Sequence, residues 1–372
     1  MRPSWVEIDL AAIRANASAI AAEIAPTELC AVVKADGYGH GDVPAAGAAV
    51  AGGARWLAVA LVEEAARLRD AAITEPILLL SEQAHVDTAE VIALDLVQTA
   101  YRWDFASAIA GEASASGSAP YPIHIKVDTG MHRVGAPPRD GLDLARRVVD
   151  DPRLRLAGVW THLAVSEEDP EFTNAQLAEL DDFLGRLRAA GIDPGTVHAA
   201  NTAGALDHPA ARRDLARVGL GVYGLRPAPD TGPGIALRPA MRVVSHVAHR
   251  RRLPAGSRPS YGRIRPLPAE GYVVTVPIGY ADGVARRLGA TGGSVLIRGV
   301  RYPFAGNVTM DQIVVSVGDD PVEVGEEVVL LGAQGDDAIS ADEWATRLDT
   351  INYEIVCDFG PRLPRRYVGA GS

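Results

Sequence analysis

The chain has 372 residues, of which 48% are hydrophobic and 22% charged, and its formal net charge is −11. That length exceeds one ordinary core and suits a barrel of about 250 residues followed by a smaller domain. The negative charge argues against nucleic acid and acidic membranes as partners. Cys30 and Cys357 lie far apart without metal-ligand spacing, which predicts no metal site and a reducing cytoplasm. The first ten residues carry charges where a signal peptide needs an apolar core.

Short apolar runs alternate with amphipathic stretches along the first part of the chain. Helical patterns cover Asp9–Ile24, Tyr101–Ser116, Gly141–Val149 and Thr173–Ala190, and the Ala-rich run Pro44–Leu61 predicts a helix followed by a strand rather than a membrane span. Eight strand–helix units predict an α/β fold with a parallel (β/α)8 TIM-type barrel. The expected strands are Cys30–Val33, Trp56–Leu61, Ile77–Leu80, Leu94–Thr99, Ile123–Val127, Leu156–Thr161, Thr196–Ala199 and Ala216–Leu220.

The sequence pattern changes after Arg226, where several prolines indicate a linker. Short β-rich runs joined by Gly, Pro and Asp turns follow, with one helix expected at Ala341–Arg347. We therefore expect a barrel domain over residues 1–232 and a mostly-β domain over residues 233–372, with residues 1–9 able to pair with the second domain. The β-rich runs are Arg242–His249, Tyr272–Ile278, Ser294–Ile297, Gln312–Val317 and Glu327–Leu331.

The stretch Ala31–Gly41 carries the first sign of chemistry. An apolar run ends in Lys34, and a turn with three glycines and Tyr38 follows at once. A lysine at the dry mouth of a strand can lose its charge and attack aldehydes. A lone lysine there is ordinarily a solvated strand end, so the other strand ends must decide between the two interpretations.

Polar side chains, several of them cationic or imidazole groups, lie within or directly after several of the other expected strands. Barrel enzymes place their chemistry at these carboxyl ends, and such a set of groups requires an anion at its centre. The backbone of Gly219–Gly221 can offer N–H groups to a phosphate. A phosphate, an aldehyde-seeking lysine and an arginine together indicate pyridoxal phosphate. The residues concerned are Lys34, Lys126, Arg133, His162, Asn201, Thr202 and Arg217.

The Ala31–Gly41 stretch closely resembles the cofactor-attachment signature of bacterial alanine racemases, and the resemblance covers nearly the whole chain. Ordered, widely spaced matches of this kind are highly specific. They include Lys126–Gly135, Thr161–Ala164, Arg217–Gly224, Ser260–Gly262, Pro277–Gly283, Met310–Gln312 and Ile351–Glu354.

The resemblance implies a cytoplasmic, fold-type III isomerase that depends on pyridoxal 5'-phosphate. Such an enzyme interconverts L- and D-alanine through an external aldimine and supplies D-alanine for the peptidoglycan of the cell wall. It also implies a homodimer with shared active sites. Lys34 then carries the cofactor and serves one face of the substrate, while Tyr261 from the other subunit serves the opposite face.

The same resemblance assigns the remaining roles. Arg217 faces the pyridine nitrogen, and because arginine only donates hydrogen bonds, it leaves the ring unprotonated and a weaker electron sink. His162 orients Arg217 and communicates with Tyr261. Arg133 contacts the cofactor's phenolic oxygen and the substrate carboxylate, and Lys126 becomes an anionic carbamate beside it.

A last group of assignments concerns the phosphate and the substrate entrance. Met310 lines the substrate site with Asp311 close by, and Tyr353 and Tyr261 narrow the entrance near Arg286. The chain departs from the commoner family pattern at Thr309, Thr202 and His132, of which His132 can alter the turn that carries Arg133. The cofactor-holding residues are Tyr38, Asn201, Thr202, Gly219, Leu220 and Tyr353.

Three alternatives remain open. A decarboxylase of basic amino acids shares this architecture, but Arg217 and the lack of a Cys-Asp motif in the second domain argue against it. A non-catalytic pyridoxal-phosphate carrier would be a lone barrel, without the second domain. A racemase of broader or serine specificity is the third, and relatives specialised for serine tend to carry Asn where this chain has Tyr353.

Overall fold

The computed structural model describes residues 3–369, whose contacts group into two compact units. The barrel unit comprises Ala12–Gly37 and Asp42–Arg238, and the β unit takes the described residues among 1–11, 38–41 and 239–372. The domain boundary expected after residue 232 stays a prediction. Strand β1 (Trp5–Asp9) pairs antiparallel with β10 (Met241–His246) and parallel with β18 (Arg365–Val368), so the chain starts in the β unit before it enters the barrel.

The barrel unit is built on eight parallel strands in the order β8-β7-β6-β5-β4-β3-β2-β9. The two strands at the ends of this order, β8 and β9, are joined by backbone hydrogen bonds from Asp214 N to Val197 O and from Arg217 N to Ala200 O, each 3.0 Å long. The predicted α/β barrel class is therefore confirmed, as a near-closed barrel. The strands are β2 (Glu28–Val32), β3 (Trp56–Val59), β4 (Ile77–Leu79), β5 (Val97–Ala100), β6 (Tyr121–Lys126), β7 (Leu154–Trp160), β8 (Thr196–His198) and β9 (Leu215–Val218).

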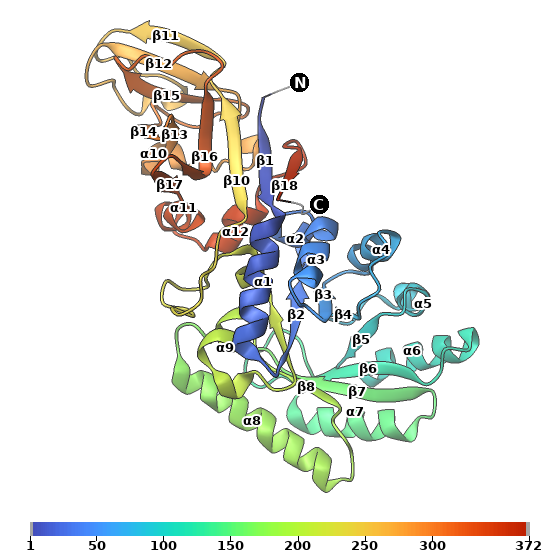
Figure 1. The fold of residues 1–372 in the computed structure, drawn as a ribbon. Helices are drawn as coiled ribbons and strands as arrows, with labels where there is room; N and C mark the ends of the chain where they lie inside the picture. The colour runs from blue at the N-terminus through green and yellow to red at the C-terminus, as the bar shows by residue number, and fades with distance from the viewer. Residues whose placement is uncertain (1–2, 370–372) are drawn as a thin grey trace. The chain divides into compact units, whose positions relative to one another are not determined.

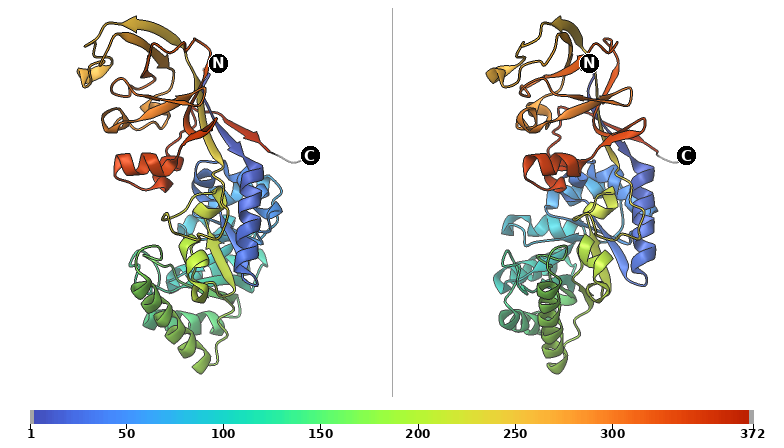
Figure 2. Two further views of the ribbon diagram at one scale, coloured as in Figure 1. Left: turned by 60° about the vertical axis from the view of Figure 1, so that its left-hand side comes forward. Right: turned by 90° about the vertical axis from the view of Figure 1, so that its left-hand side faces the viewer.

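Helices lie on the outer side of these strands (Figures 1 and 2). The strands are covered on both faces, which is why they read as continuous apolar runs instead of alternating ones. Helix α1 (Leu10–Ile24) buries Ile13, Ile20 and Ile24 on one face. The others are α2 (Lys34–Tyr38), α3 (Asp42–Ala51), α4 (Val62–Asp70), α5 (Thr88–Ala93), α6 (Trp103–Ser116), α7 (Pro138–Asp150), α8 (Pro170–Ala189) and α9 (Thr202–Asp207).

The β unit holds two sheets and three short helices, as a mostly-β domain should. One sheet runs β14-β13-β16-β10-β1-β18 with β17 beside β16, and the other runs β11-β12-β15. The single strand expected over Arg242–His249 is wrong in one respect, since β10 ends at His246 and β11 begins at His249. The remaining elements are β11 (His249–Leu253), β12 (Gly271–Val276), β13 (Ser294–Ile297), β14 (Val300–Pro303), β15 (Ile313–Gly318), β16 (Glu327–Gln334), β17 (Asp337–Ile339), α10 (Leu288–Thr291), α11 (Ala341–Leu348) and α12 (Asn352–Cys357).

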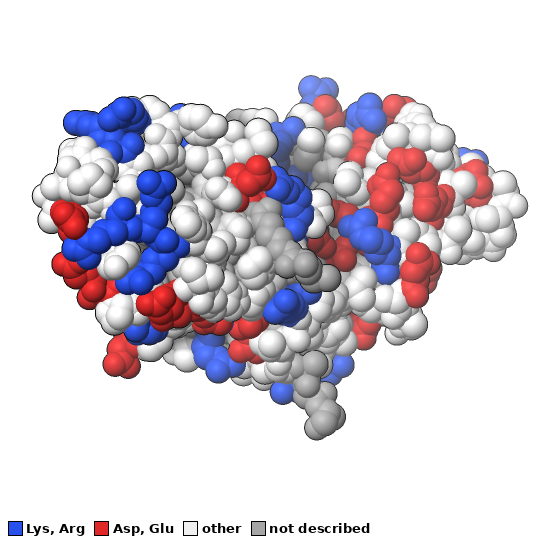
Figure 3. Space-filling view, turned by 90° about the horizontal axis from the view of Figure 1, so that it is seen from above, with Lys and Arg blue, Asp and Glu red and all other residues white. Residues whose placement is uncertain are grey.

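The surface carries charges of both signs, as the view in Figure 3 shows. Two arginines of the basic edge strand β11 form ion pairs, Arg250 with Glu323 and Arg252 with Glu270. No helix among the described residues is long and apolar enough to cross a membrane.

Candidate active site

Lys34 stands at the start of a strained turn that follows β2. The next four residues, Ala35, Asp36, Gly37 and Tyr38, all have φ between 53° and 59°. A left-handed conformation costs a non-glycine residue about 1 kcal/mol or more, so the surroundings must enforce it. Such enforced strain is typical of functional sites.

A buried carboxylate holds this turn in place. Glu64 Oε1 accepts a hydrogen bond from Ala35 N at 2.7 Å, and its Oε2 accepts from Ala60 N at 2.8 Å and Leu61 N at 3.1 Å. Gly37 N also donates to Val33 O at 2.9 Å. Glu64 therefore ties the turn after β2 to the turn after β3, which fixes the backbone that carries Lys34.

Arg217, on β9, is the buried cation at the centre of the barrel's carboxyl end. It is 3% exposed, and its guanidinium donates to His198 Nδ1 at 2.8 Å and His162 Nδ1 at 3.2 Å. The carbonyl oxygens of Thr161 and Ala199 accept from it at 2.8 and 3.1 Å. Burial lowers the pKa of Arg217 to about 10. All of these partners are neutral acceptors, which orient the guanidinium without neutralising its charge.

Trp160, the last residue of β7, contacts two cations in this centre. The guanidinium carbon of Arg217 lies 4.4 Å from the ring centroid and the Lys126 ammonium nitrogen 4.6 Å from it. The His198 ring stacks on the same indole at 5.4 Å and 11°. A shared aromatic face stabilises cations that have no carboxylate partner.

Lys126 ends β6 with only 2% of its surface exposed, so it does not reach out to solvent. Burial lowers its pKa to about 7, helped by the charges of Arg217, Arg133 and Lys34 and opposed by Asp128. At neutral pH a large share of this amine is therefore uncharged, and an uncharged amine is a nucleophile.

Arg133 follows a turn organised by Asp128. The Asp128 carboxylate accepts hydrogen bonds from Gly130 N and His132 N, both at 3.0 Å. His132 has φ 56°, a left-handed conformation that glycine adopts more easily. His132 departs from the commoner family pattern, and the turn accommodates it because Asp128 accepts a hydrogen bond from the His132 backbone and contacts its ring at 3.3 Å.

The predicted phosphate region lies where β8 ends and α9 begins. Asn201 caps α9, since its side chain accepts from Gly204 N at 2.9 Å and from Ser166 Oγ at 2.8 Å. Thr202 is buried and lies 3.5 Å from Gly221 N. These contacts bring the start of α9 next to the turn Gly219–Gly221. The backbone N–H groups of this turn lie at the start of the short helix η3 (Leu220–Tyr223).

Tyr38 and Tyr353 belong to the β unit, where their rings lie 6.2 Å apart. Burial and the neighbouring Tyr353 raise the pKa of Tyr38. The adjacent Gly39 is required by close packing, because a Cβ there would lie 2.3 Å from the Val356 carbonyl oxygen.

Tyr261 and Met310 are exposed residues of the β unit, at 73% and 53%. Their two loops are joined through Asn307, whose amide donates to Tyr261 O at 2.9 Å and whose carbonyl accepts from Ser260 Oγ at 2.6 Å. Met310 is followed by Asp311, which pairs with Arg362 at 2.6 Å. Thr309, which also departs from the commoner family pattern, stabilises the turn that follows it, because its hydroxyl donates to Gln312 O at 2.8 Å.

The structure gathers five of the predicted residues into one site. Burial and then the charges of Arg217, Lys126, Arg133 and Lys34 lower the pKa of His162 well below its usual value, which indicates that the four cations lie near it. Sequence reasoning assigned no role to Trp160, His198 and His124, which lie within expected strands. The signal available was a histidine or tryptophan inside or at the end of a buried strand.

The donor set fits a small anionic aldehyde such as pyridoxal phosphate. Within residues 3–369, no ion pair joins Arg217, Lys126 or Arg133 to a carboxylate. The whole chain contains only two lysines, Lys34 and Lys126, and both belong to this set. Arg217 and Lys126 are buried, and buried cations of this kind need an anion, while a lysine beside them offers the amine for an aldehyde.

Comparisons with known proteins agree with this chemistry. Residues 8–227 match the family described as "Alanine racemase, N-terminal domain", and residues 240–367 match "Alanine racemase, C-terminal domain". The chain is 43% identical over 371 residues to the alanine racemase of Symbiobacterium thermophilum, covering 99% of this chain and 98% of the relative.

Solved structures give the same result. Alanine racemase from Streptomyces lavendulae has a TM-score of 0.94 at 37% identity, over 100% of this chain and 98% of that one. Histidine racemase from Leuconostoc mesenteroides reaches a TM-score of 0.90 at 26% identity, over 99% of this chain and 98% of that one. This chain therefore belongs to the alanine racemase family, whose members are pyridoxal-phosphate-dependent isomerases.

Proposed function

We propose that the protein interconverts L- and D-alanine with pyridoxal phosphate bound at the carboxyl end of the barrel. The observation that carries the proposal is the group of Arg217, Lys126 and Lys34. Arg217 and Lys126 are buried and form no ion pair with a carboxylate among the described residues, and the group holds every lysine of the chain. When bound, the cofactor supplies a conjugated ring that accepts the electron pair left on the substrate Cα when its proton departs.

Side chains and backbone groups together would hold the cofactor. The Lys34 amine would attach to its aldehyde carbon, and Arg217 would donate a hydrogen bond to its ring nitrogen. Thr202 and the backbone N–H groups of Gly219 and Leu220 would bind its phosphate. In the same scheme Asn201 supports Thr202 by capping α9, and Tyr38 and Tyr353 complete the phosphate site.

Arg217 limits the reaction to proton exchange. A guanidinium donates and cannot accept, so it leaves the ring nitrogen unprotonated and the ring a moderate electron sink. Its four neutral acceptors leave its charge in place. A moderate sink favours rapid return of the proton to Cα over transamination or decarboxylation, which argues against the decarboxylase alternative.

Two bases would move the proton. Lys34 would remove it from, or return it to, one face of Cα, and Tyr261 of the partner subunit would serve the opposite face. Removal on one face and return on the other inverts the stereocentre. Tyr261 lies 73% exposed on a turn fixed through Asn307, which supports a role in another copy of the chain. Met310, one loop away, would line the same substrate site.

Lys126 would act as an anion after it reacts with carbon dioxide. The neutral amine nitrogen attacks the carbon of CO2, a C–N bond forms, and the amine proton leaves to solvent. The resulting carbamate would neutralise the repulsion between Lys126 and Arg133, and Arg133 would then be held ready for the substrate carboxylate. The lowered pKa of Lys126, about 7, supports this reaction at neutral pH.

The test combines trapping with stereochemistry. Borohydride treatment of the cofactor-loaded protein, followed by peptide mass mapping, should place the pyridoxyl group on Lys34 and not on Lys126. Circular dichroism should show L- and D-alanine converging on the same mixture. A pyridoxyl group elsewhere, or release of carbon dioxide from basic amino acids without racemisation, would contradict the proposal.

Substrate breadth needs its own measurement, because a histidine racemase shares this fold at 26% identity. Racemisation of L-serine and L-histidine should be compared with that of L-alanine by kcat/KM. We expect alanine to be preferred, since Tyr353 and Tyr261 of the partner subunit would narrow the entrance. Growth of a D-alanine auxotroph carrying this chain would test the supply of D-alanine for peptidoglycan.

A further inference from the structure

A continuous row of hydrogen bonds runs through the barrel interior from its carboxyl end toward its amino end. His162 Nδ1 accepts from Arg217, Arg217 donates to His198 Nδ1 at 2.8 Å, and His198 Nε2 lies 2.9 Å from His124 Nδ1. His198 and His124 are 0% and 1% exposed. The function proposed above uses Arg217 but assigns nothing to the two deeper histidines.

The direction of every bond in this row follows from Arg217. A guanidinium only donates, so His198 Nδ1 must be an unprotonated acceptor. A neutral His198 therefore carries its proton on Nε2 and donates to His124 Nδ1. His124 Nδ1 is then an acceptor too, and its own proton sits on Nε2. Burial and the charge of Arg217 keep the pKa of His198 well below its usual value, in agreement with this neutral state.

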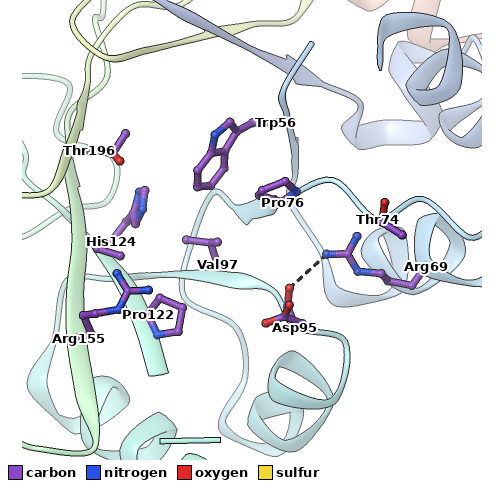
Figure 4. Close-up of a pocket in the computed structure, with 11 residues that line it drawn as sticks. Trp56, Arg69, Thr74, Pro76, Asp95, Val97, Pro122, His124, Arg155 and Thr196 are labelled. Carbon is purple, nitrogen blue, oxygen red and sulfur yellow. Dashed lines mark hydrogen bonds between the residues drawn. The ribbon is translucent and has the colours of Figure 1, made fainter. Parts of the chain in front are cut away.

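The His124 ring packs against a glycine on one side and borders a cavity on another. Gly158 makes room for it, because a Cβ on that residue would lie 2.6 Å from His124 Cε1. Beyond the ring, a cavity of about 340 Å³ opens among the first residues of several barrel strands, with His124, Trp56 and Arg155 in its wall (Figure 4). Nδ1 is occupied by His198, which leaves Nε2–H for this cavity.

We propose that His124 is a positioning residue for racemisation, which selects the Nε2–H tautomer of His198 and thereby fixes the Arg217 guanidinium. The inference rests on the proposed function for what Arg217 contacts. A neutral imidazole can carry its proton on either nitrogen, and the stacking of His198 on Trp160 does not choose between the two tautomers. Only the tautomer with a bare Nδ1 can accept from the guanidinium, and an acceptor at His124 Nδ1 makes that tautomer the stable one.

Loss of the His124 acceptor would leave a buried N–H of His198 unsatisfied, which is costly. His198 relieves that cost by moving its proton to Nδ1, where it then faces the donors of Arg217. The guanidinium must turn away from His198, and its bond to the cofactor's ring nitrogen weakens. Because Lys34 and Arg133 are untouched, substrate binding should be largely preserved.

An isosteric pair of variants isolates the acceptor. In His124→Asn the amide oxygen replaces Nδ1, whereas His124→Leu has the same shape without an acceptor. We expect His124→Leu to lower kcat about tenfold with little change in KM, the size of one lost hydrogen bond, and His124→Asn to restore most of the loss. The absorption band of the bound cofactor should shift in the Leu variant only.

Trp56→Phe is the matched control, since Trp56 lines the same cavity and its ring lies 5.9 Å from that of His124 without a hydrogen bond to it. It should leave kcat unchanged. Equal losses in His124→Leu, His124→Asn and Trp56→Phe would reduce His124 to a packing role and overturn the proposal. If His124→Leu does not fold, Gly158→Ala provides the second variant, because its methyl group displaces the ring while His124 remains.

The tautomers can be read in the cofactor-free protein, independently of any activity. With histidine labelled by nitrogen-15, long-range proton–nitrogen spectra should show His124 and His198 neutral, with the proton on Nε2. The two of the nine histidines are assigned by their loss in His124→Asn and His198→Asn. A proton on Nδ1 of either ring overturns the inference. The correct tautomers in a protein that fails to racemise alanine would instead count against the proposed function.

Discussion

The barrel centre and the exposed loops of the β unit solve the problem of placing functional groups in opposite ways. Arg217 and Lys126 are 3% and 2% exposed, and surrounding side chains set their orientation and charge. Tyr261 and Met310 are 73% and 53% exposed, and only their backbone turns are fixed. The barrel residues are thus prepared by their own chain, whereas Tyr261 needs a second surface to give its hydroxyl a defined environment.

This contrast has a chemical consequence. Burial without carboxylates makes the barrel centre a strong attractor for an anion and shifts the pKa of Lys126 toward neutrality. An exposed tyrosine has no such influence until another molecule covers it. The comparison therefore predicts that barrel variants alter cofactor attachment, while variants of the exposed loops alter catalysis and assembly.

The largest expected effect comes from Lys34. Lys34→Ala should lower racemase activity by roughly four orders of magnitude or more, because it removes the attachment point and one of the two bases. Borohydride trapping should then leave no pyridoxyl group on the chain. Attachment at Lys126, the only other lysine, would show that the two amines exchange roles.

Tyr261 tests the exposed side of the comparison. Tyr261→Phe should keep the cofactor bound and lower racemisation by about two to four orders of magnitude, the range for loss of a general acid or base. Exchange of the Cα proton with deuterated solvent should survive for the enantiomer whose proton faces Lys34. Equal losses of exchange for both enantiomers would contradict a two-base scheme.

Lys126 sharpens the comparison through pH. A carbamate forms only on the neutral amine, and the pKa of Lys126 is about 7. As pH falls below 7 the amine takes up a proton, the proposed carbamate beside Arg133 is lost, and KM for alanine should rise about tenfold. Lys126→Ala should have the raised KM at every pH between 6 and 8.

Carbon-13 NMR with labelled bicarbonate supplies the independent check on Lys126. Wild-type protein should give one carbamate signal that Lys126→Ala lacks, and with only two lysines the assignment is simple. A KM that falls in parallel in both proteins as pH rises would assign the pH dependence to another group.

Glu64 carries the smallest of these effects. In the wild type both carboxylate oxygens of Glu64 accept hydrogen bonds from backbone N–H groups, and Glu64→Gln replaces one of these oxygens by an NH2 group that cannot accept. The unfolding free energy should fall by about 2–3 kcal/mol, measured as a lower thermal midpoint. The exposed neighbour Glu63→Gln is the matched control and should leave the midpoint unchanged. Equal midpoints for both variants would mean that the Lys34 turn is held by other contacts.

Sequence reasoning reached the barrel and the strand-end residues because both follow local rules. Buried parallel strands read as apolar runs, and chemistry at their carboxyl ends predicts which side chains converge. Lys34, Lys126, His162 and Arg217 were singled out this way, and the charges of the other three contribute to the lowered pKa of His162.

The remaining features depend on barrel geometry that no local pattern records. His124 and His198 are 74 residues apart and meet only because β6, β7 and β8 stand side by side around Gly158. The turn after Lys34 was expected to rely on glycines, yet Ala35 and Asp36 also adopt left-handed conformations there, held by Glu64. The edge strands β11 and β18 are rich in arginine and carry too few apolar residues to be recognised.

Mixed dimers offer the most direct test of the central claim that the buried and the exposed groups of two chains form one active site. Chains with Lys34→Ala and with Tyr261→Ala, each inactive alone, should be combined and the mixed dimer isolated by two different affinity tags. One site in each mixed dimer would then contain both intact residues, and activity should return to roughly half that of the wild type. Verified mixed dimers no more active than either parent would contradict the account and assign Lys34 and Tyr261 to a site within one chain.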